Sequence, residues 1–391
     1  MIGSLLQYGE FFLRGLARPQ VRRVLLQHWK GLPHGIPNDH DRALHALADH
    51  FCLAQDNGTD DGLGSYQVIK GWSASYPETT GYIIPTLLAL APRLQRPDLK
   101  DRAIRAGAWL LSIQRADGGW QGGRVDRPRP TIVFNTAQVI RGSVALAMSM
   151  NDDRYMEAAV RAADRIVAWQ EADGSWREHN FLQRSRVYDS YVSAPLLRMA
   201  HITGNDAYRA AAVKNLEYVL SMQTRNGWFK DADNTIVHND RPITHTIAYT
   251  LDGLLESYGS LRDERFLASA LKSADVLLEI FMAEGRLHGR YDSSWKGSEH
   301  MITTGNAQLA IVWARSAKIT GQRKYSDASK RMVEQLIAIQ QTSDRGPAEA
   351  RGAVSGSFPL WGRYEKFAYP NWAQKYFADA ILAGEGIFTE P

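Results

Sequence analysis

The sequence is short of cysteine and of long apolar runs. Its 391 residues include one cysteine, Cys52, so the chain can form neither an internal disulfide nor a metal site built from several cysteines. No apolar stretch is long enough to span a bilayer, and the first residues lack the charged start, apolar run and small-residue cleavage site of a secretory leader. These absences predict a protein of a reducing, cytoplasmic compartment.

An excess of charge of one sign is also missing. The chain has 46 Lys and Arg against 42 Asp and Glu, and this net charge of +4 is too small to indicate a nucleic-acid partner. It remains compatible with an acidic small molecule or an acidic glycan. The sequence contains no G-x-S-x-G elbow, no phosphate-binding P-loop and no H-E-x-x-H zinc motif. Its scattered histidines neither build nor exclude a metal site, and we predict no cofactor.

Aromatic residues, in contrast, are plentiful. The chain has 11 Trp and 16 Tyr, which are the residues that most often stack on sugars and line apolar clefts. A hydrophobic content of 44% with 23% charged residues is typical of a globular protein with ample core material.

A short phrase recurs along the chain. "QRADGGW" at 114–120 and "QEADGSW" at 170–176 are nearly identical, and their glycine recurs at nearly even intervals, at Gly62, Gly118, Gly174, Gly227, Gly285 and Gly346. A helix-like stretch precedes each glycine; in the second, Ile104, Ala108 and Leu111 share one face. We expect each of these outer helices to end at its glycine, because glycine enters the left-handed conformation cheaply.

A second, more apolar helix follows each glycine after an irregular loop. These inner helices are expected to begin near Thr79, Phe134, Tyr188, Ile243, Thr303 and Tyr369. They are apolar most of the way round, as in helices buried on both sides. Six such hairpins predict an all-α (α/α)6 toroid over residues 40–391, preceded by a helical extension over residues 1–39. The extension is amphipathic and basic near one end, and packing on its own domain is favoured over docking on a membrane or a partner.

Two known groups of toroids share these features. The repeated phrases resemble the QW repeat of squalene cyclases and prenyltransferases. The overall pattern is similar to that of six-hairpin glycosidases, uronate-polysaccharide lyases and sugar epimerases, and "SYPETTGYIIPTLLALA" and "YPNWAQKYFADAIL" resemble a bacterial branch associated with polysaccharide genes. The resemblance implies the (α/α)6 fold and a carbohydrate-active enzyme.

The chain does not contain the catalytic motifs of the isoprenoid enzymes. The strings nearest to the DxDD acid motif of the cyclases, "NDHDRA" and "TDDG", do not match it. The zinc-binding prenyltransferases need a cysteine near the centre, whereas Cys52 lies in the first outer helix, and lanthionine cyclases need two cysteines. An isoprenoid enzyme therefore remains an alternative only.

The candidate site lies where the six inner helices begin. Their N-termini gather at one end of a toroid, and the unsatisfied N–H groups there favour an anionic substrate. The candidate catalytic residues are His245, Tyr249, Asn135, Glu78 and Asp189. The candidate substrate-binding residues are Trp72, Tyr82, Arg124, Gln138, Tyr188, Trp295, Asn306, Asn371, Trp372 and Lys375, and the loops add further candidates such as His238.

Two chemistries fit these candidates. His245 and Tyr249 are spaced i and i+4 and share one helix face, so they could act as base and acid in elimination from a uronate whose carboxylate Asn135 binds. The toroid lyases that the chain resembles use such residues, and a C5-epimerase needs the same first step. Hydrolysis needs two carboxyls, for which Glu78 and Asp189 are the best pair. Each residue also has a structural alternative, as core filling or as helix capping.

The repeated phrase itself is expected to be scaffold. Gln114 and Gln170 are placed to bind backbone groups, and Trp120 and Trp176 to pack on neighbouring helices. The sequence therefore predicts a lyase or hydrolase acting on an acidic, uronate-containing poly- or oligosaccharide. The alternatives are a uronyl C5-epimerase, an isoprenoid cyclase or transferase relative, and a toroid that binds a glycan or a protein without catalysis.

Overall fold

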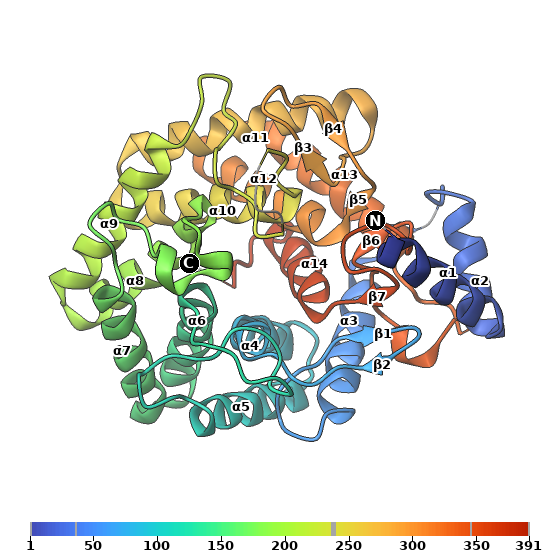
Figure 1. The fold of residues 1–391 in the computed structure, drawn as a ribbon, viewed down its shortest axis with the longest axis horizontal. Helices are drawn as coiled ribbons and strands as arrows, with labels where there is room; N and C mark the ends of the chain where they lie inside the picture. The colour runs from blue at the N-terminus through green and yellow to red at the C-terminus, as the bar shows by residue number, and fades with distance from the viewer. Residues whose placement is uncertain (1, 36, 236–239, 345, 390–391) are drawn as a thin grey trace.

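The computed structural model forms a ring of helical hairpins (Figure 1). It describes residues 2–35, 37–235, 240–344 and 346–389, and of residues 2–7 it describes the backbone only. The outer helices are α3 (His40–Asp56), α5 (Pro97–Ser112), α7 (Asp153–Ala168), α9 (Asp206–Ser221), α11 (Glu264–Glu284) and α13 (Arg323–Ile339). The inner helices are α4 (Pro77–Arg93), α6 (Val133–Met150), α8 (Ser190–Thr203), α10 (Thr244–Leu261), α12 (Thr303–Thr320) and α14 (Asn371–Gly384).

The inner helices form a closed ring. Each packs against the next, and α14 contacts both α12 and α4, which completes the (α/α)6 toroid that the sequence predicts. The six inner helices begin within two residues of the predicted starts. Close approach of α4 and α6 depends on Gly81 and Gly142, because a Cβ on Gly81 would lie 2.6 Å from the Cα of Val139.

The two ends of the toroid differ in their connections. Each of the first five inner helices is joined to the following outer helix by only two or three residues, and Asp152, Asn205 and Asp263 cap three of those outer helices. Long loops join each outer helix to the following inner helix at the opposite end. The N-termini of all six inner helices therefore lie under long loops, as expected. We call this the loop end and the other the short-link end.

The repeated glutamine and glycine hold the long loops to the scaffold. The Gln114 side chain donates to the carbonyl of Gly118 (2.8 Å) and to that of Ala158 on the next outer helix (2.9 Å). Gln170 repeats this pattern with Gly174 (3.2 Å) and Ala211 (2.7 Å). Gln55, Gln223 and Gln340 make corresponding pairs of bonds, and the last one ties α13 to Ala43 of α3. The scaffold role predicted for the phrase is confirmed.

The role of the glycine differs from the prediction. Among the described helices only α11 ends at its repeat glycine, Gly285; the others end several residues earlier. Gly118 lies instead in the following turn with φ +89°, and a Cβ there would lie 2.6 Å from the Arg161 carbonyl oxygen. At Gly118, and likewise at Gly174 and Gly227, the glycine is therefore required for close approach of the loop to the next helix, whereas Gly285 caps α11. Trp120 and Trp176 are fully buried, and each indole donates to the carbonyl ten residues before it, Leu110 and Ile166 respectively.

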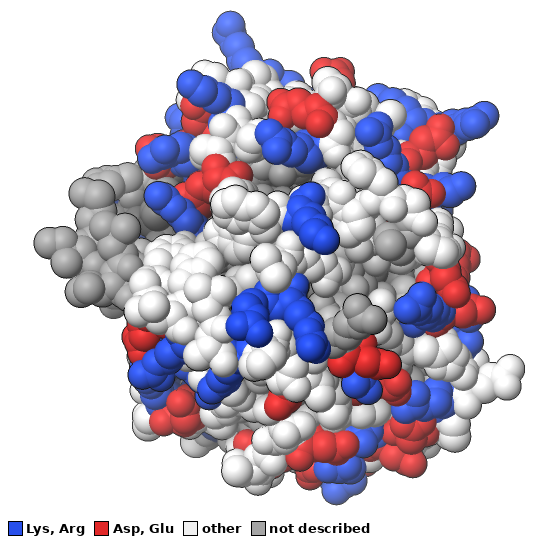
Figure 2. All heavy atoms as spheres, turned by 90° about the vertical axis from the view of Figure 1, so that its right-hand side faces the viewer, with Lys and Arg blue, Asp and Glu red and all other residues white. Residues whose placement is uncertain are grey.

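The N-terminal helices α1 (Ile2–Leu16) and α2 (Pro19–Trp29) pack on one side of the ring. Phe11 contacts Phe367 with ring centroids 5.0 Å apart, and the His28 ring accepts a hydrogen bond from the Leu360 backbone (2.9 Å). Figure 2 shows this side, with Lys and Arg gathered near its centre and Asp and Glu mostly around them. Packing of these helices on the toroid agrees with the favoured prediction. None of the described helices has the length and apolarity needed to cross a membrane.

Short strands join some of the long loops. β1 (Tyr66–Gln67) pairs with β2 (Gly71–Trp72) and with β7 (Ala368–Tyr369), so the loops that precede α4 and α14 are joined. β3 (Arg290–Tyr291) pairs with β4 (Gly297–Ser298), and β5 (Met301–Ile302) pairs with β6 (Ser357–Phe358). Single turns of 3-10 helix occur at Arg177–His179, Phe181–Gln183, Val187–Asp189 and Ala348–Ala350.

Candidate functional site

A cavity of about 220 Å³ lies at the loop end, over the beginnings of four inner-helix segments. Its walls combine the first turns of α4, α6, α10 and α14 with three loops that cover them. The described residues that line it are Tyr76, Glu78, Thr79, Tyr82, Phe134, Phe181, Tyr188, Asn234, Thr235, His245, Tyr249, Tyr364, Glu365 and Trp372. The site is thus mainly aromatic, with two carboxyl groups and one imidazole.

Glu78 is placed by the first turn of α4. Its side chain is only 7% exposed, and burial raises the pKa of the carboxyl from 4.5 to about 7, although a hydrogen bond with the Tyr76 hydroxyl acts in the opposite direction. Tyr76 in turn accepts a hydrogen bond from the Asn135 amide (3.1 Å). A carboxyl with a pKa near neutrality holds a proton at working pH and can donate it, as a general acid must.

A network of phenols forms the base of the cavity. The Tyr376 hydroxyl donates to that of Tyr249 (3.2 Å), and Tyr249 also bonds with Tyr82. Burial raises the pKa of Tyr249 far above its usual value, so this phenol stays protonated. It can donate hydrogen bonds to a substrate, but it is a poor source of the phenolate that would act as a base.

His245 lies beside Tyr249, with ring centroids 4.5 Å apart. Its Nδ1 lies 2.6 Å from the Gln308 side-chain oxygen, which can only accept, so Nδ1 carries the proton and Nε2 is the free basic nitrogen. Burial lowers the pKa of this histidine to about 4. The ring is therefore neutral near pH 7, able to accept a hydrogen bond but weak as a base.

Two further carboxyl groups, those of Glu365 and Asp189, have raised pKa values in different settings. Glu365, in the loop before α14, lines the cavity itself; burial raises its pKa, and the charge of Arg124 opposes this. Asp189 is fully buried outside the lining and accepts a hydrogen bond from the Asn180 amide (2.7 Å). Burial raises the pKa of Asp189 to about 8.

The cavity gathers six of the fifteen predicted site residues. These are Glu78, Tyr82, Tyr188, His245, Tyr249 and Trp372, and the Trp372 indole donates to the Tyr364 hydroxyl (2.9 Å). Asn135 reaches the cavity through Tyr76 alone. Their catalytic and binding roles remain predictions.

The other predicted residues lie outside the lining. Lys375 is buried and paired with Asp379 (2.7 Å), Gln138 accepts from Arg141 (3.1 Å), and Trp72 packs against His50. Asn371 bonds to the Leu63 carbonyl and to Thr79, Trp295 donates to the Asn226 carbonyl, Arg124 is exposed, and Asn306 is buried in α12. Several inner-helix polar groups are therefore turned toward neighbouring helices or loops and not toward the cavity. His238 lies outside the described residues.

Sequence reasoning missed the residues that the loops contribute. Phe181, Asn234, Thr235, Tyr364 and Glu365 come from irregular segments whose course no periodicity indicates. It also missed Arg186, a fully buried arginine whose charge acts on both Tyr188 and Asp189. Its Nε and Nη2 find no hydrogen-bond partner within the described part of the chain. Among the same residues no three His, Cys, Asp or Glu side chains are grouped so as to hold a metal ion.

Comparison with known proteins gives similarity in structure only. No family model and no curated protein matches the chain. Among solved structures, an unsaturated glucuronyl hydrolase specific for heparin superposes with a TM-score of 0.72 at 14% identity, over 90% of this chain and 99% of that one. The unsaturated glucuronyl hydrolase of Bacillus sp. GL1 gives 0.65 at 15% identity, over 88% and 96%. An α-amylase from Clostridium perfringens gives 0.65 at 11%, over 89% and 99%. At these identities the likeness establishes the fold, an (α/α)6 toroid of the kind found in these enzymes.

Proposed function

We propose that this protein is a glycoside hydrolase that cleaves an acidic, uronate-containing oligosaccharide, with Glu78 as the proton donor. The observation that carries the proposal is the pKa of about 7 that burial gives Glu78 inside an aromatic cavity at the loop end. The solved structures named unsaturated glucuronyl hydrolases, one of them responsible for glycosaminoglycan degradation, support the substrate class.

The titrating groups favour hydrolysis over elimination. Elimination needs a base strong enough to remove the proton at C5, and His245 with a pKa of about 4 is a weak one. Tyr249 is held in its protonated form. Glu78 combines access to the cavity with a pKa suited to protonating a leaving oxygen or an unsaturated bond.

The second carboxyl of the reaction is assigned to Glu365. Glycoside hydrolysis generally uses two carboxyls across the scissile bond, one as acid and one to activate water or attack the sugar. Glu365 shares the cavity with Glu78 but comes from a different segment of the chain. Asp189, whose buried carboxyl lies outside the lining, is the reserve candidate.

Recognition of the uronate carboxylate is assigned to buried donors and not to surface cations. No Lys or Arg occurs among the described lining residues. The N-termini of α4 and α14 supply partial positive charge at the cavity, and Arg186, whose charge acts on Tyr188 of the lining, has guanidinium nitrogens without partners in the described segments. A buried polar group left unpaired is costly, so such a group in a folded protein is a sound candidate for a ligand contact.

The test is incubation with disaccharides that carry either an unsaturated or a saturated uronate at the non-reducing end. Hydrolysis of the unsaturated substrate consumes the ultraviolet absorbance of its C4–C5 double bond and releases a reducing sugar. Neutral disaccharides of the same linkage serve as the control for the carboxylate. Absence of turnover on all uronyl substrates, by protein of normal thermal stability, would reject the proposal.

Elimination remains the second candidate, because His245 and Tyr249 adjoin within the cavity and Asn135 lies one hydrogen bond away. A lyase acting on a saturated polyuronate creates the double bond that a hydrolase consumes. The sign of the absorbance change therefore distinguishes the two reactions in one assay.

The proposal includes three finer points. It places the protein in the cytoplasm, which the single Cys52 supports. It divides the chain into an extension over 1–39 and a catalytic toroid over 40–391. It also retains a membrane or partner contact through the extension, where Leu13 and Trp29 are 74% and 80% exposed. Sedimentation with anionic vesicles, compared for the chain and its Trp29→Ala variant, tests that contact.

A further inference from the structure

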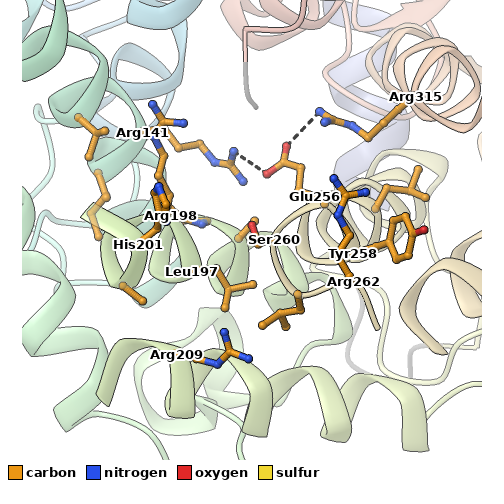
Figure 3. Close-up of a pocket in the computed structure, with 18 of the residues that line it drawn as sticks. Arg141, Leu197, Arg198, His201, Arg209, Glu256, Tyr258, Ser260, Arg262 and Arg315 are labelled. Atoms are coloured by element: carbon orange, nitrogen blue, oxygen red, sulfur yellow. Dashed lines mark hydrogen bonds and ion pairs between the residues drawn. The ribbon is translucent and has the colours of Figure 1, made fainter. Parts of the chain in front are cut away.

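A second, larger depression lies at the short-link end, on the opposite side of the toroid from the cavity. It measures about 800 Å³ and is formed where α6, α8, α10 and α12 end, together with the start of α9 (Figure 3). It shares no lining residue with the cavity at the loop end. Its size is that of an ordinary small-molecule site.

The floor of the depression is a fixed network of charges. Glu256 binds Arg141 (2.9 Å) and Arg315 (3.4 Å), and Arg315 also binds Asp252 (3.0 Å). Figure 3 shows the Glu256 carboxylate between the two guanidinium groups. All four side chains are at most 10% exposed. Two arginines against two acids leave this floor electrically balanced and rigid.

The rim, in contrast, carries an excess of positive charge. Arg198 on α8, Arg209 on α9, Arg262 at the end of α10 and Lys318 on α12 all line the depression, and Asp206 is the one acid among them. None of the four cations forms an ion pair with an acid in the described part of the chain. Three of the four contact uncharged groups: Arg198 contacts the Met148 sulfur, Arg262 the Tyr258 ring and Lys318 the Phe388 ring.

Helix-end electrostatics account for only part of this rim. Cations at the C-termini of α8, α10 and α12 complement the helix dipoles. Arg209, however, lies near the N-terminus of α9, where the dipole disfavours a cation. Arg262 caps α10 with φ +57°, a position that glycine occupies at the ends of α8 and α12. An arginine is thus kept over the depression at a backbone conformation that favours glycine.

We propose that this depression binds an organic anion that carries several separated oxyanion groups. The rim cations come from four helices around the opening, so a lone inorganic ion would engage one side only. Arginine pairs with carboxylate, sulfate or phosphate oxygens through two parallel hydrogen bonds. Between the cations, the partly exposed side chains of Ala200, Leu261 and Ile319 offer apolar surface to the body of the ligand. The chemistry is shared by sulfated or uronate oligosaccharides and by nucleoside diphosphates, and it is independent of the reaction at the cavity.

Titration calorimetry at low and at physiological salt tests the proposal with three probes. These are a sulfated uronate tetrasaccharide, a nucleoside diphosphate and inorganic phosphate. We expect at least one of the first two to bind at least tenfold more tightly than phosphate and to weaken with salt. The probe that binds more tightly identifies the source of the anionic groups, and either result supports the site.

The deciding variant is the double substitution Arg209→Glu and Arg262→Glu. It should weaken the bound probe at least tenfold while turnover at the cavity stays unchanged. The double substitution Arg42→Glu and Lys100→Glu, at exposed positions outside the depression, makes the same change in net charge and should leave binding intact. If the first variant unfolds, Arg209→Ala alone is measured in its place. Absence of binding by both organic probes, or equal affinity in rim and control variants, overturns the proposal.

Discussion

The two ends of this toroid handle charge in opposite ways. At the loop end, Glu78 and Asp189 are buried without an ion-pair partner among the described residues, and burial raises the pKa of Glu78 to about 7 and that of Asp189 to about 8. At the short-link end, the buried Glu256 lies between Arg141 and Arg315 as part of a paired network. The inner helices thus supply partial positive charge to an acidic site at one end and partial negative charge to a basic site at the other.

This difference separates groups kept for chemistry from groups kept for structure. Burial without a neighbouring cation destabilises the charged form of an acid and so raises its pKa, and acids of this kind are common where a proton has to be transferred. A buried acid shared by two arginines is part of the packing, and its removal leaves cations in the interior. Substitution of one carboxyl at each end should therefore give opposite results.

The largest effect is expected for Glu78→Gln. Gln has nearly the shape of the protonated acid but cannot donate the catalytic proton, so kcat should fall about 10²- to 10⁴-fold. Steady-state hydrolysis of a uronyl disaccharide, with thermal melting measured in parallel, checks this. Asp379→Asn is the matched control, since that buried carboxyl is paired with Lys375 and lies outside the cavity lining. Wild-type kcat in the Glu78 variant would remove this residue from the mechanism.

Glu256→Ala, in contrast, is expected to reduce the stability of the fold. Loss of this carboxylate removes the shared partner of Arg141 and Arg315 in the interior and should lower the free energy of unfolding by about 3–5 kcal/mol. Denaturant unfolding measures the change. Arg262→Ala on the rim, an exposed position of the same depression, should stay within about 0.5 kcal/mol of wild type. Equal stability of the two variants would mean that the floor network is not needed for the fold.

The pH dependence of stability distinguishes the ends further. Because burial raises the pKa of Glu78 from 4.5 to about 7, the folded chain retains a proton that the unfolded chain releases between those values. The stabilising contribution is complete below pH 4.5 and is lost as the pH rises to 7, by about 3 kcal/mol in all. The stability of Glu78→Gln relative to wild type should therefore rise by this amount between pH 4 and 8. A constant difference across that range would show that Glu78 titrates normally.

The scaffold could be predicted from the sequence because its signals are local and repeated. The spacing of apolar residues located the inner helices, and the recurring glutamine, glycine and tryptophan identified the hairpins. The site could be predicted only where it is built from helix starts, as with Glu78, Tyr82 and His245. The loop residues Tyr364 and Glu365 reach the cavity through long-range pairing, since β7, just after them, is held by β1 at the other end of the chain.

Helix rotation set the other limit on prediction. Gln138 and Lys375 belong to inner helices as expected. Each, however, bonds to a residue one turn further along its own helix, Arg141 and Asp379 respectively, and does not line the cavity. The balanced network of Glu256 and Arg315 gave no signal either, because its members lie far apart in sequence and each resembles an ordinary helix residue.

The smallest effect is expected for the repeated phrase, and it tests whether the role of that phrase is structural only. Gln170→Ala removes hydrogen bonds to the carbonyls of Gly174 and Ala211 and should lower the free energy of unfolding by about 1–2 kcal/mol. It should leave kcat unchanged, because none of these groups lines the cavity. At the short-link end, Asp263→Ala removes the cap of α11 at a cost of about 1 kcal/mol, which provides a matched comparison. A fall in kcat with Gln170→Ala, at unchanged stability, would mean that the turn positions the catalytic loops as well as holding the ring.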